Sequence, residues 1–128
     1  MLGKLVLWVS TIAFVSYGVA CLFSPQLPAE FAGLGMLNGN GYAEVGAMYG
    51  GLQTGFGLFC LLAALKSEFY RSGLVALVMV IGALAIGRLV STFTAPEGLT
   101  FYTWGALGYE FATAILAGIA LQQSQSNA

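Results

Sequence analysis

Histidine is absent from the 128 residues of this chain, and charged side chains are scarce. Without histidine, the chain has no haem held by two imidazoles, no zinc or iron site built on histidine, and no catalytic triad with an imidazole base. Four basic and five acidic residues give a net charge of −1, with no basic cluster. That balance argues against binding to nucleic acid and against a polybasic contact with anionic lipid. We therefore predict no metal, no cofactor and no nucleic-acid partner.

Apolar residues dominate the composition. Hydrophobic residues make up 59% of the chain and charged residues only 7%, whereas about a quarter of the residues of a soluble domain are charged. One helical crossing of a bilayer takes about 20 mostly apolar residues, so this length has room for about four crossings and no separate soluble domain. The composition predicts one integral membrane domain that covers residues 1 to 128.

Four long apolar segments are separated by turn-forming or charged residues, and we expect each segment to cross the membrane as a helix. The predicted spans cover residues 3 to 23, 41 to 65, 71 to 94 and 101 to 121. Lys66, Glu68 and Arg71 are expected to form a charged turn, and residues 122 to 127 a polar tail. The predicted fold class is all-α, an up-and-down four-helix membrane bundle.

The connection between the first two spans, residues 24 to 40, is the longest and is rich in proline, glycine and asparagine. It also contains Phe31, Leu34, Met36 and Leu37, which make it too apolar for an ordinary solvated loop. We expect either a short helix at the headgroup boundary or a flap over the end of the bundle.

A second interpretation of the N-terminal segment stays open. Lys4, the apolar run after it and the sequence Gly18-Val19-Ala20-Cys21 resemble a lipoprotein signal with its cysteine. The apolar run is long for a signal peptide and Gly18 is unusual at that position, so a membrane span is favoured. Cys21 and Cys60 are expected at opposite ends of neighbouring spans, too far apart for a disulfide, and are interpreted as packing residues.

Basic residues predict the orientation of the chain. Lys4 precedes the first span, Lys66 and Arg71 lie between the second and third, and the other two connections contain no lysine or arginine. Because basic residues favour the cytoplasmic side, we expect both termini to be cytoplasmic and the long connection to lie outside.

Three charged residues, Glu44, Arg88 and Glu110, lie inside the apolar segments, each in the predicted outer half of its span. An uncompensated charge near the middle of a membrane costs at least about 2.5 to 3.5 kcal/mol, so Arg88 is expected to face the carboxylates. Glu110 shares a helical face with small residues such as Ala114 and Ala117, which are typical of a helix contact.

Two interpretations of this predicted cluster stay open. In the structural one, Arg88 joins one or both glutamates and locks three helices in register. In the functional one, two acids and one base leave a formal charge of −1, which awaits a proton, a cation or a polar headgroup. Four residues are expected to support the cluster with hydrogen bonds or a polar lining: Tyr49, Gln53, Ser91 and Thr92.

The second span contains closely spaced glycines: Gly46, Gly50, Gly51 and Gly55. Glycines four residues apart let another helix approach closely, so we expect them in helix packing, with a seam between copies of the chain as the alternative. Gln53 lies in the same span and is expected either to bond a neighbouring helix or to line a polar cavity.

The run Glu44-Val45-Gly46-Ala47-Met48-Tyr49-Gly50-Gly51, followed by Gly87-Arg88 and by Glu110, resembles the small bacterial membrane proteins called domain of unknown function 4345. That family is similar in plan to the DoxX-like four-helix proteins. The resemblance implies the bundle fold and the bacterial inner (cytoplasmic) membrane, but no activity. The DoxX-like comparison suggests a subunit that serves a quinone-linked or redox-stress complex.

The leading hypothesis is an uncharacterised, non-enzymatic membrane protein, either an accessory subunit or a module that binds a small ligand or lipid at the Glu44, Arg88 and Glu110 cluster. Its expected partners are membrane lipid, a quinone, subunits of a membrane complex or a second copy of the chain. The alternative is a small membrane enzyme or proton-coupled carrier, with Glu110 as acid and base and Arg88 as its charge partner.

Overall fold

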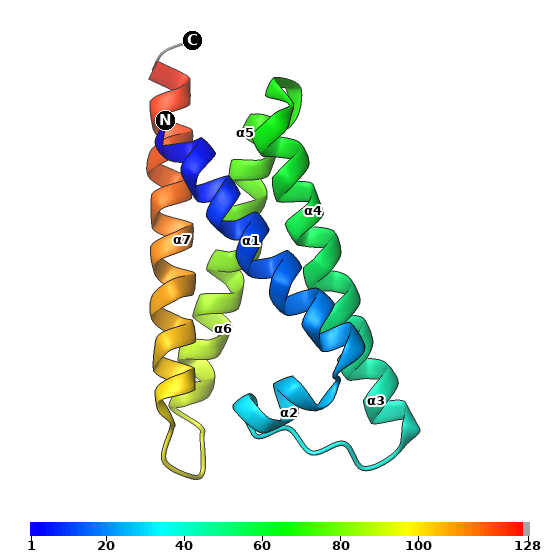
Figure 1. Cartoon of the computed structure of the whole chain (residues 1–128). Coiled ribbons are helices and arrows are strands. Elements are labelled where there is room, and N and C mark those ends of the chain that lie inside the picture. The colour runs from blue at the N-terminus through cyan, green and yellow to red at the C-terminus, as the bar shows by residue number, and fades with distance from the viewer. Residues whose placement is uncertain (127–128) are drawn as a thin grey trace. The chain divides into compact units, whose positions relative to one another are not determined.

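The computed structural model describes residues 1 to 126 and shows an all-helical chain, with no strand among those residues. The helices and π-helical turns are labelled in chain order in Figure 1. They are α1 (Leu2–Phe23), α2 (Gln26–Ala32), α3 (Gly39–Val45), η1 (Gly46–Gly51), α4 (Leu52–Leu65), α5 (Ser67–Ala76), η2 (Leu77–Ile81), α6 (Gly82–Thr92) and α7 (Phe101–Ser126).

Four helices are long and apolar enough to cross a membrane. The second combines α3, η1 and α4, and the third combines α5, η2 and α6. The four stretches are Leu2–Phe23, Gly39–Leu65, Ser67–Thr92 and Phe101–Ser124. The prediction of an all-α chain is confirmed, and the chain has four helices with the length and apolarity needed to span a membrane.

One predicted boundary was wrong. Lys66 alone leaves the helical conformation between α4 and α5, with φ −110° and ψ 118°, so Glu68 and Arg71 lie within α5 and not in a turn. The fourth helix continues beyond the predicted end of the span near residue 121, as far as Ser126. The residues that follow Leu121 include no glycine or proline, and glutamine favours the helix, so nothing there ends it.

Two π-helical turns interrupt the long helices, η1 in the second and η2 in the third. Each adds residues to a turn of the helix and so rotates the side chains that follow; such turns are often found at functional sites. The sequence analysis did not predict either of them.

The chain divides into two compact units. Unit 1 contains Met1–Leu7 and the chain from Ala63 onward, and unit 2 contains Trp8–Leu62. The arrangement of all four helices as one up-and-down domain stays a prediction.

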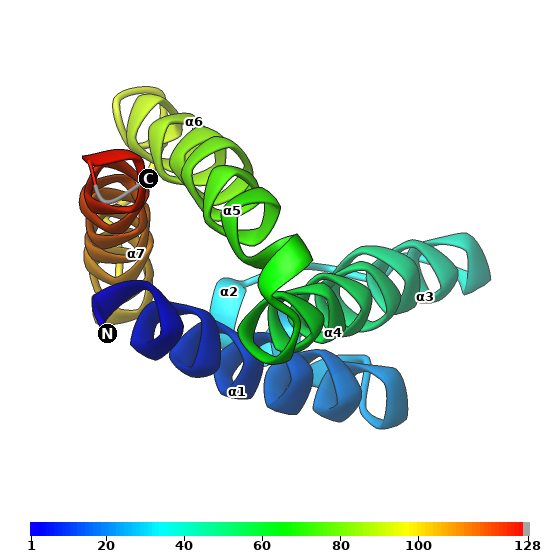
Figure 2. The same ribbon diagram turned by 90° about the horizontal axis from the view of Figure 1, so that it is seen from above.

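In unit 1, α7 packs antiparallel to η2 and α6. A Cβ added to Gly82 would lie 3.8 Å from Ala114, and one added to Gly118 would lie 3.9 Å from Val78, so residue numbers rise along one helix as they fall along the other. Figures 1 and 2 show these helices side by side, joined by the loop of residues 93 to 100. The buried side chains between them include Leu77, Ile81, Ala85, Leu107 and Ala117.

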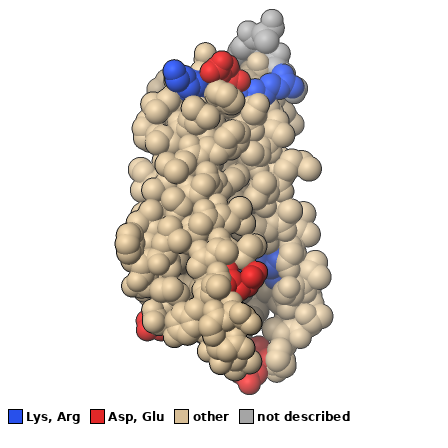
Figure 3. All heavy atoms as spheres, turned by 90° about the vertical axis from the view of Figure 1, so that its right-hand side faces the viewer, with Lys and Arg blue, Asp and Glu red and all other residues tan. Residues whose placement is uncertain are grey.

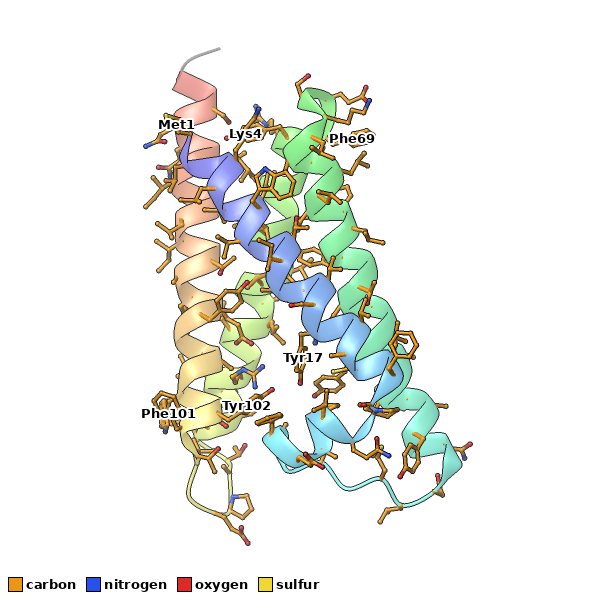
Figure 4. All side chains as sticks on the ribbon, in the orientation of Figure 1. Met1, Lys4, Tyr17, Phe69, Phe101 and Tyr102 are labelled. Carbon is orange, nitrogen blue, oxygen red and sulfur yellow. The ribbon has the colours of Figure 1, made fainter. Side chains whose placement is uncertain are left out.

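The two ends of unit 1 differ in the side chains that they carry. Figure 4 places Met1, Lys4 and Phe69 at one end, and Phe101 and Tyr102 at the other. Gly3 lies against the Tyr70 hydroxyl, which brings the start of α1 beside the start of α5. The basic residues outside the predicted spans, Lys4, Lys66 and Arg71, therefore share one end of the unit. Figure 3 shows charged atoms gathered at this end, next to a wide zone without charged atoms.

In unit 2, α1 and α4 cross with almost no space between their backbones. A Cβ on Gly18 would lie 2.6 Å from the backbone nitrogen of Thr54, and one on Gly57 would lie 2.8 Å from the backbone nitrogen of Val15. The rings of Phe14 and Phe56 meet edge to face, with centroids 5.2 Å apart. The two helices run antiparallel and lie side by side in Figures 1 and 2.

The structure shows a close contact with α1 at one of the four glycines for which packing is predicted. Gly50 lies against Leu22 of α1, where an added Cβ would be 2.6 Å from the leucine side chain. No atom outside the local helix backbone lies within 4 Å of a Cβ built on Gly46 or Gly55, and Gly51 meets only the Gly46 carbonyl, at 3.9 Å. Because Gly51 and Gly55 point away from α1, and α1 ends at Phe23, these three glycines do not contact that helix. A seam between copies of the chain stays a prediction.

Both cysteines lie in unit 2, where Cys21 and Cys60 are buried free thiols. Their burial agrees with the interpretation of both as packing residues.

Candidate functional site

The antiparallel packing of α6 and α7 brings Arg88 and Glu110 together. Arg88 lies near the end of α6, and Glu110 lies in the part of α7 that runs back alongside it. The turn between the helices contains Pro96, Glu97 and Gly98, which suit a chain reversal. Two residues that are 22 positions apart in the sequence therefore meet on facing helices.

The pair has a two-pronged geometry. Arg88 Nε donates to both carboxylate oxygens of Glu110, at 3.1 Å and 2.9 Å, and a terminal guanidinium nitrogen of Arg88 donates to Oε1 at 2.7 Å. Hydrogen bonds between a guanidinium and a carboxylate are short and strong, and two at once also fix the orientation of both planes. The pair therefore holds α6 and α7 in register.

The two partners are buried to different extents. The Glu110 side chain is only 5% exposed, whereas 26% of the Arg88 side chain is accessible. On α7, Leu107, Thr113 and Ala117 are buried on the same side as Glu110. Glu110 therefore faces the interior of unit 1, and Arg88 lies between Glu110 and the surface of the unit.

Ser91 and Thr92 do not donate hydrogen bonds to this pair. The Ser91 hydroxyl donates to the Gly87 carbonyl at 2.9 Å, and the Thr92 hydroxyl donates to the Leu89 carbonyl at 2.6 Å. Both bonds stay within the same helix, a common alternative for serine and threonine in apolar surroundings. Their predicted supporting role is therefore limited to lining the face of α6 that carries Arg88.

The other predicted site residues belong to unit 2. Glu44 is exposed on α3 and forms no ion pair with any residue that the structure describes. Tyr49 in η1 and Gln53 in α4 are half-buried, and the Gln53 side chain has no hydrogen bond within residues 1 to 126. The structure thus shows the Arg88–Glu110 part of the predicted cluster, and the inclusion of Glu44, Tyr49 and Gln53 stays a prediction.

The sequence analysis missed buried polar residues in unit 2, and Ser10 is one of them. Ser10 is fully buried in α1, and its hydroxyl has no hydrogen-bond partner in the described part of the chain. A serine in the middle of an apolar run is a signal that could have identified it, because a buried hydroxyl usually needs a partner.

The arrangement can fix two helices and present a guanidinium whose charge is balanced by a carboxylate. No cluster of three or more histidine, cysteine, aspartate or glutamate residues that could hold a metal ion occurs in the described residues. The Arg88–Glu110 pair itself offers a polar binding point within apolar surroundings.

Comparison with known proteins supports the resemblance seen in the sequence. A family model described as Domain of unknown function (DUF4345) matches residues 2–121. No curated protein and no solved structure matches the chain. Because the match extends over nearly the whole sequence and includes both members of the Arg88–Glu110 pair, this chain belongs to the DUF4345 family.

Proposed function

We propose that this protein is a non-enzymatic membrane module, a ligand-binding protein or accessory subunit, that binds an amphiphilic molecule at the Arg88–Glu110 pair. The observation that carries this proposal is the uneven burial of the two side chains, 5% exposed for Glu110 and 26% for Arg88. An arginine in an apolar segment is costly and is often functional. Here Glu110 balances its charge, and the accessible part of Arg88 can contact an oxygen atom of a ligand.

The surroundings of Arg88 suggest the chemistry of that ligand. Leu84 lies one turn before Arg88 on the same face of α6 and is exposed, so the accessible guanidinium adjoins apolar surface. A fitting ligand has an apolar body and a head group with oxygen atoms that accept hydrogen bonds. A phospholipid and a quinone share this chemistry.

Native mass spectrometry of the protein, purified from membranes in a mild detergent, tests this proposal. We expect the wild-type protein to carry a bound molecule, and its mass distinguishes a phospholipid from a quinone. Arg88→Lys keeps the charge but loses the planar two-pronged contact with Glu110, so the bound molecule should be lost. The matched control is Arg71→Lys, because Arg71 is exposed on α5 in the same unit.

Two outcomes would contradict the proposal. One is a wild-type protein that carries no amphiphile even in the mildest detergent. The other is retention of the molecule by Arg88→Lys at the wild-type level. A molecule lost equally from Arg88→Lys and Arg71→Lys would point to general loosening of unit 1 and would also count against a site at Arg88.

The proposal extends to Glu44 as the third charge of the site. Its charge would then favour a ligand with a cationic group next to the oxygen atoms, as in a zwitterionic headgroup. Glu44→Gln should weaken retention of such a lipid and leave an uncharged quinone unaffected. Equal retention of every bound molecule by Glu44→Gln would remove Glu44 from the site.

The alternative, an enzyme or proton-coupled carrier that uses Glu110 as acid and base, finds less support in the geometry. Both carboxylate oxygens of Glu110 accept hydrogen bonds from Arg88. An acid or base needs an oxygen within reach of the proton that it moves. Proton uptake into vesicles that contain the protein, abolished by Glu110→Gln, would favour this alternative.

We also propose that the four helices form an up-and-down bundle in a bacterial inner membrane, with both termini in the cytoplasm and the α1–α3 connection outside. The start of α1, with Lys4, lies beside the start of α5, with Lys66 and Arg71, and this shared location at one end of unit 1 supports the orientation. A C-terminal fusion to green fluorescent protein should be fluorescent, and one to alkaline phosphatase inactive. The reverse pattern would contradict the orientation. A DoxX-like role in a quinone-linked or redox-stress complex belongs to the same proposal.

A further inference from the structure

The α1–α3 connection, residues 24 to 38, includes α2 and joins two helices of membrane-spanning length. Within unit 2, α1 and α4 run antiparallel, as the contacts of Gly18 with Thr54 and of Gly57 with Val15 show. The end of α1 and the start of α3 therefore lie at the same end of unit 2. If these helices cross the bilayer, the connection has to lie at one membrane surface.

The connection has a defined backbone structure. Gly33 ends α2 in the left-handed conformation, with φ +70°, and the Leu34 N–H donates to the Ala29 carbonyl at 3.2 Å. This is the six-residue reversal by which many helices end. The Asn38 side chain then accepts from the backbone N–H groups of Asn40 and Gly41 and so begins α3.

The backbone structure holds large apolar side chains at the surface of unit 2. Phe31 is 58% exposed and Leu37 is 95% exposed. In the helical projection of α2, Leu27, Pro28 and Phe31 share one face, on which Pro28 is buried in the protein and Phe31 is exposed, whereas Gln26 and Glu30 share another. Phe23, at the end of α1, is 85% exposed, so the apolar surface of a membrane-spanning helix continues directly into the connection.

We propose that the α1–α3 connection is a membrane-interface segment, in which Phe31 and Leu37 insert among the lipid chains just below the headgroups and Gln26 and Glu30 lie at headgroup level. Lipid is the occupant that these observations favour, because the exposed side chains continue a helix surface that itself has the composition of a lipid-facing one. The inference requires that the helices span the membrane, but it does not depend on the ligand proposed for Arg88.

Spin labels test this placement. Cys21→Ala and Cys60→Ala give a background without native thiols, and single cysteines then replace Phe31 and Leu37, with Gln26 and Glu30 as matched controls in the same segment. In phospholipid vesicles, labels at positions 31 and 37 should collide more with oxygen than with a water-soluble nickel chelate. Labels at positions 26 and 30 should show the opposite preference.

Two results would overturn the inference. Labels at positions 31 and 37 that are as accessible to nickel as those at positions 26 and 30 would place the segment in water. Labels at 31 and 37 that are shielded from both reagents would mean that protein covers these side chains, from this chain, a second copy or another partner. Neither result would change which molecule the wild-type protein carries in native mass spectrometry, so the two proposals fail independently.

A second measurement applies if the cysteine-free background does not fold. Trp8→Phe and Trp104→Phe remove the native tryptophans, and Leu37→Trp introduces one at the most exposed apolar position of the segment. Its fluorescence should be quenched by lipids brominated near the headgroup end of the acyl chain, more than by lipids brominated near the chain terminus. Absence of quenching by either lipid would overturn the inference.

Discussion

Arg88 and Glu110 are joined by one guanidinium edge: the Nε of Arg88 reaches both oxygens of Glu110, and a terminal nitrogen contacts Oε1 at 2.7 Å. Removal of either partner leaves an unpaired charge in apolar surroundings. This lowers the free energy of unfolding far more than removal of both partners does. We expect Arg88→Ala to destabilise the protein by about 3 kcal/mol, the lower part of the range for a buried pair because Arg88 is partly accessible. Thermal unfolding in detergent measures the loss.

The double replacement of Arg88 and Glu110 by leucine is the decisive control. Because no unpaired charge remains, the double variant should unfold at a higher temperature than either single leucine variant. If the losses of the single variants simply add in the double variant, the two residues are not energetically coupled. The geometry described above would then contribute nothing to stability.

Gly57→Ala is expected to destabilise the crossing of α1 and α4. The new Cβ would lie 2.8 Å from the backbone nitrogen of Val15, and a backbone atom cannot move aside as a side chain can. We expect a loss of about 1 to 3 kcal/mol, typical of overpacking, measured by thermal unfolding. Gly55→Ala is the matched control, because no atom lies within 4 Å of its Cβ and alanine favours the helix. Equal losses from both variants would contradict the close crossing.

Gly33→Ala is expected to loosen the end of α2. Gly33 has φ +70°, a conformation that costs a residue with a Cβ about 1 to 2 kcal/mol. Hydrogen exchange followed by mass spectrometry should show faster exchange in the peptide that contains the Leu34 N–H. Gly35→Ala, at a glycine without positive φ in the same connection, should leave exchange unchanged. Unchanged exchange in both variants would refute the helix ending described for Gly33.

Asn38→Ala is expected to fray the start of α3. The Asn38 side chain accepts from two backbone N–H groups, at 3.0 Å and 3.3 Å, and loss of such a cap costs about 1 kcal/mol. Asn38→Asp keeps an acceptor oxygen and should preserve protection of the Asn40 and Gly41 amides from hydrogen exchange. Asp and Ala variants that exchange at the same rate would show that the cap has no effect.

The sequence predicted the helices well because their signal is strong. Each stretch is long, apolar and separated from the next by turn-forming or charged residues, as at Pro96 and Gly98. The partnership of Arg88 with Glu110 was predictable for a related reason, since the cost of an isolated charge in apolar surroundings leaves few alternatives to pairing.

Other features depend on information that no local pattern contains. Which glycines meet α1 depends on the crossing point and on the end of α1 at Phe23, so Gly50 could not be separated from Gly55 by spacing alone. The residues Ser67 to Arg71 look like a charged turn, yet they are compatible with the first turns of a helix and become part of α5. The π-helical turns leave the apolar composition unchanged and so give no signal.

The link at Lys66 has a consequence for the way α4 and α5 can move. Only this residue separates the two helices, and they meet so closely that an added Cβ on Gly73 would collide with Ala63. A link of one residue leaves almost no chain by which the adjoining helix ends could separate. If both apolar stretches cross a bilayer, as their length and composition allow, they do so as one tightly packed helical hairpin.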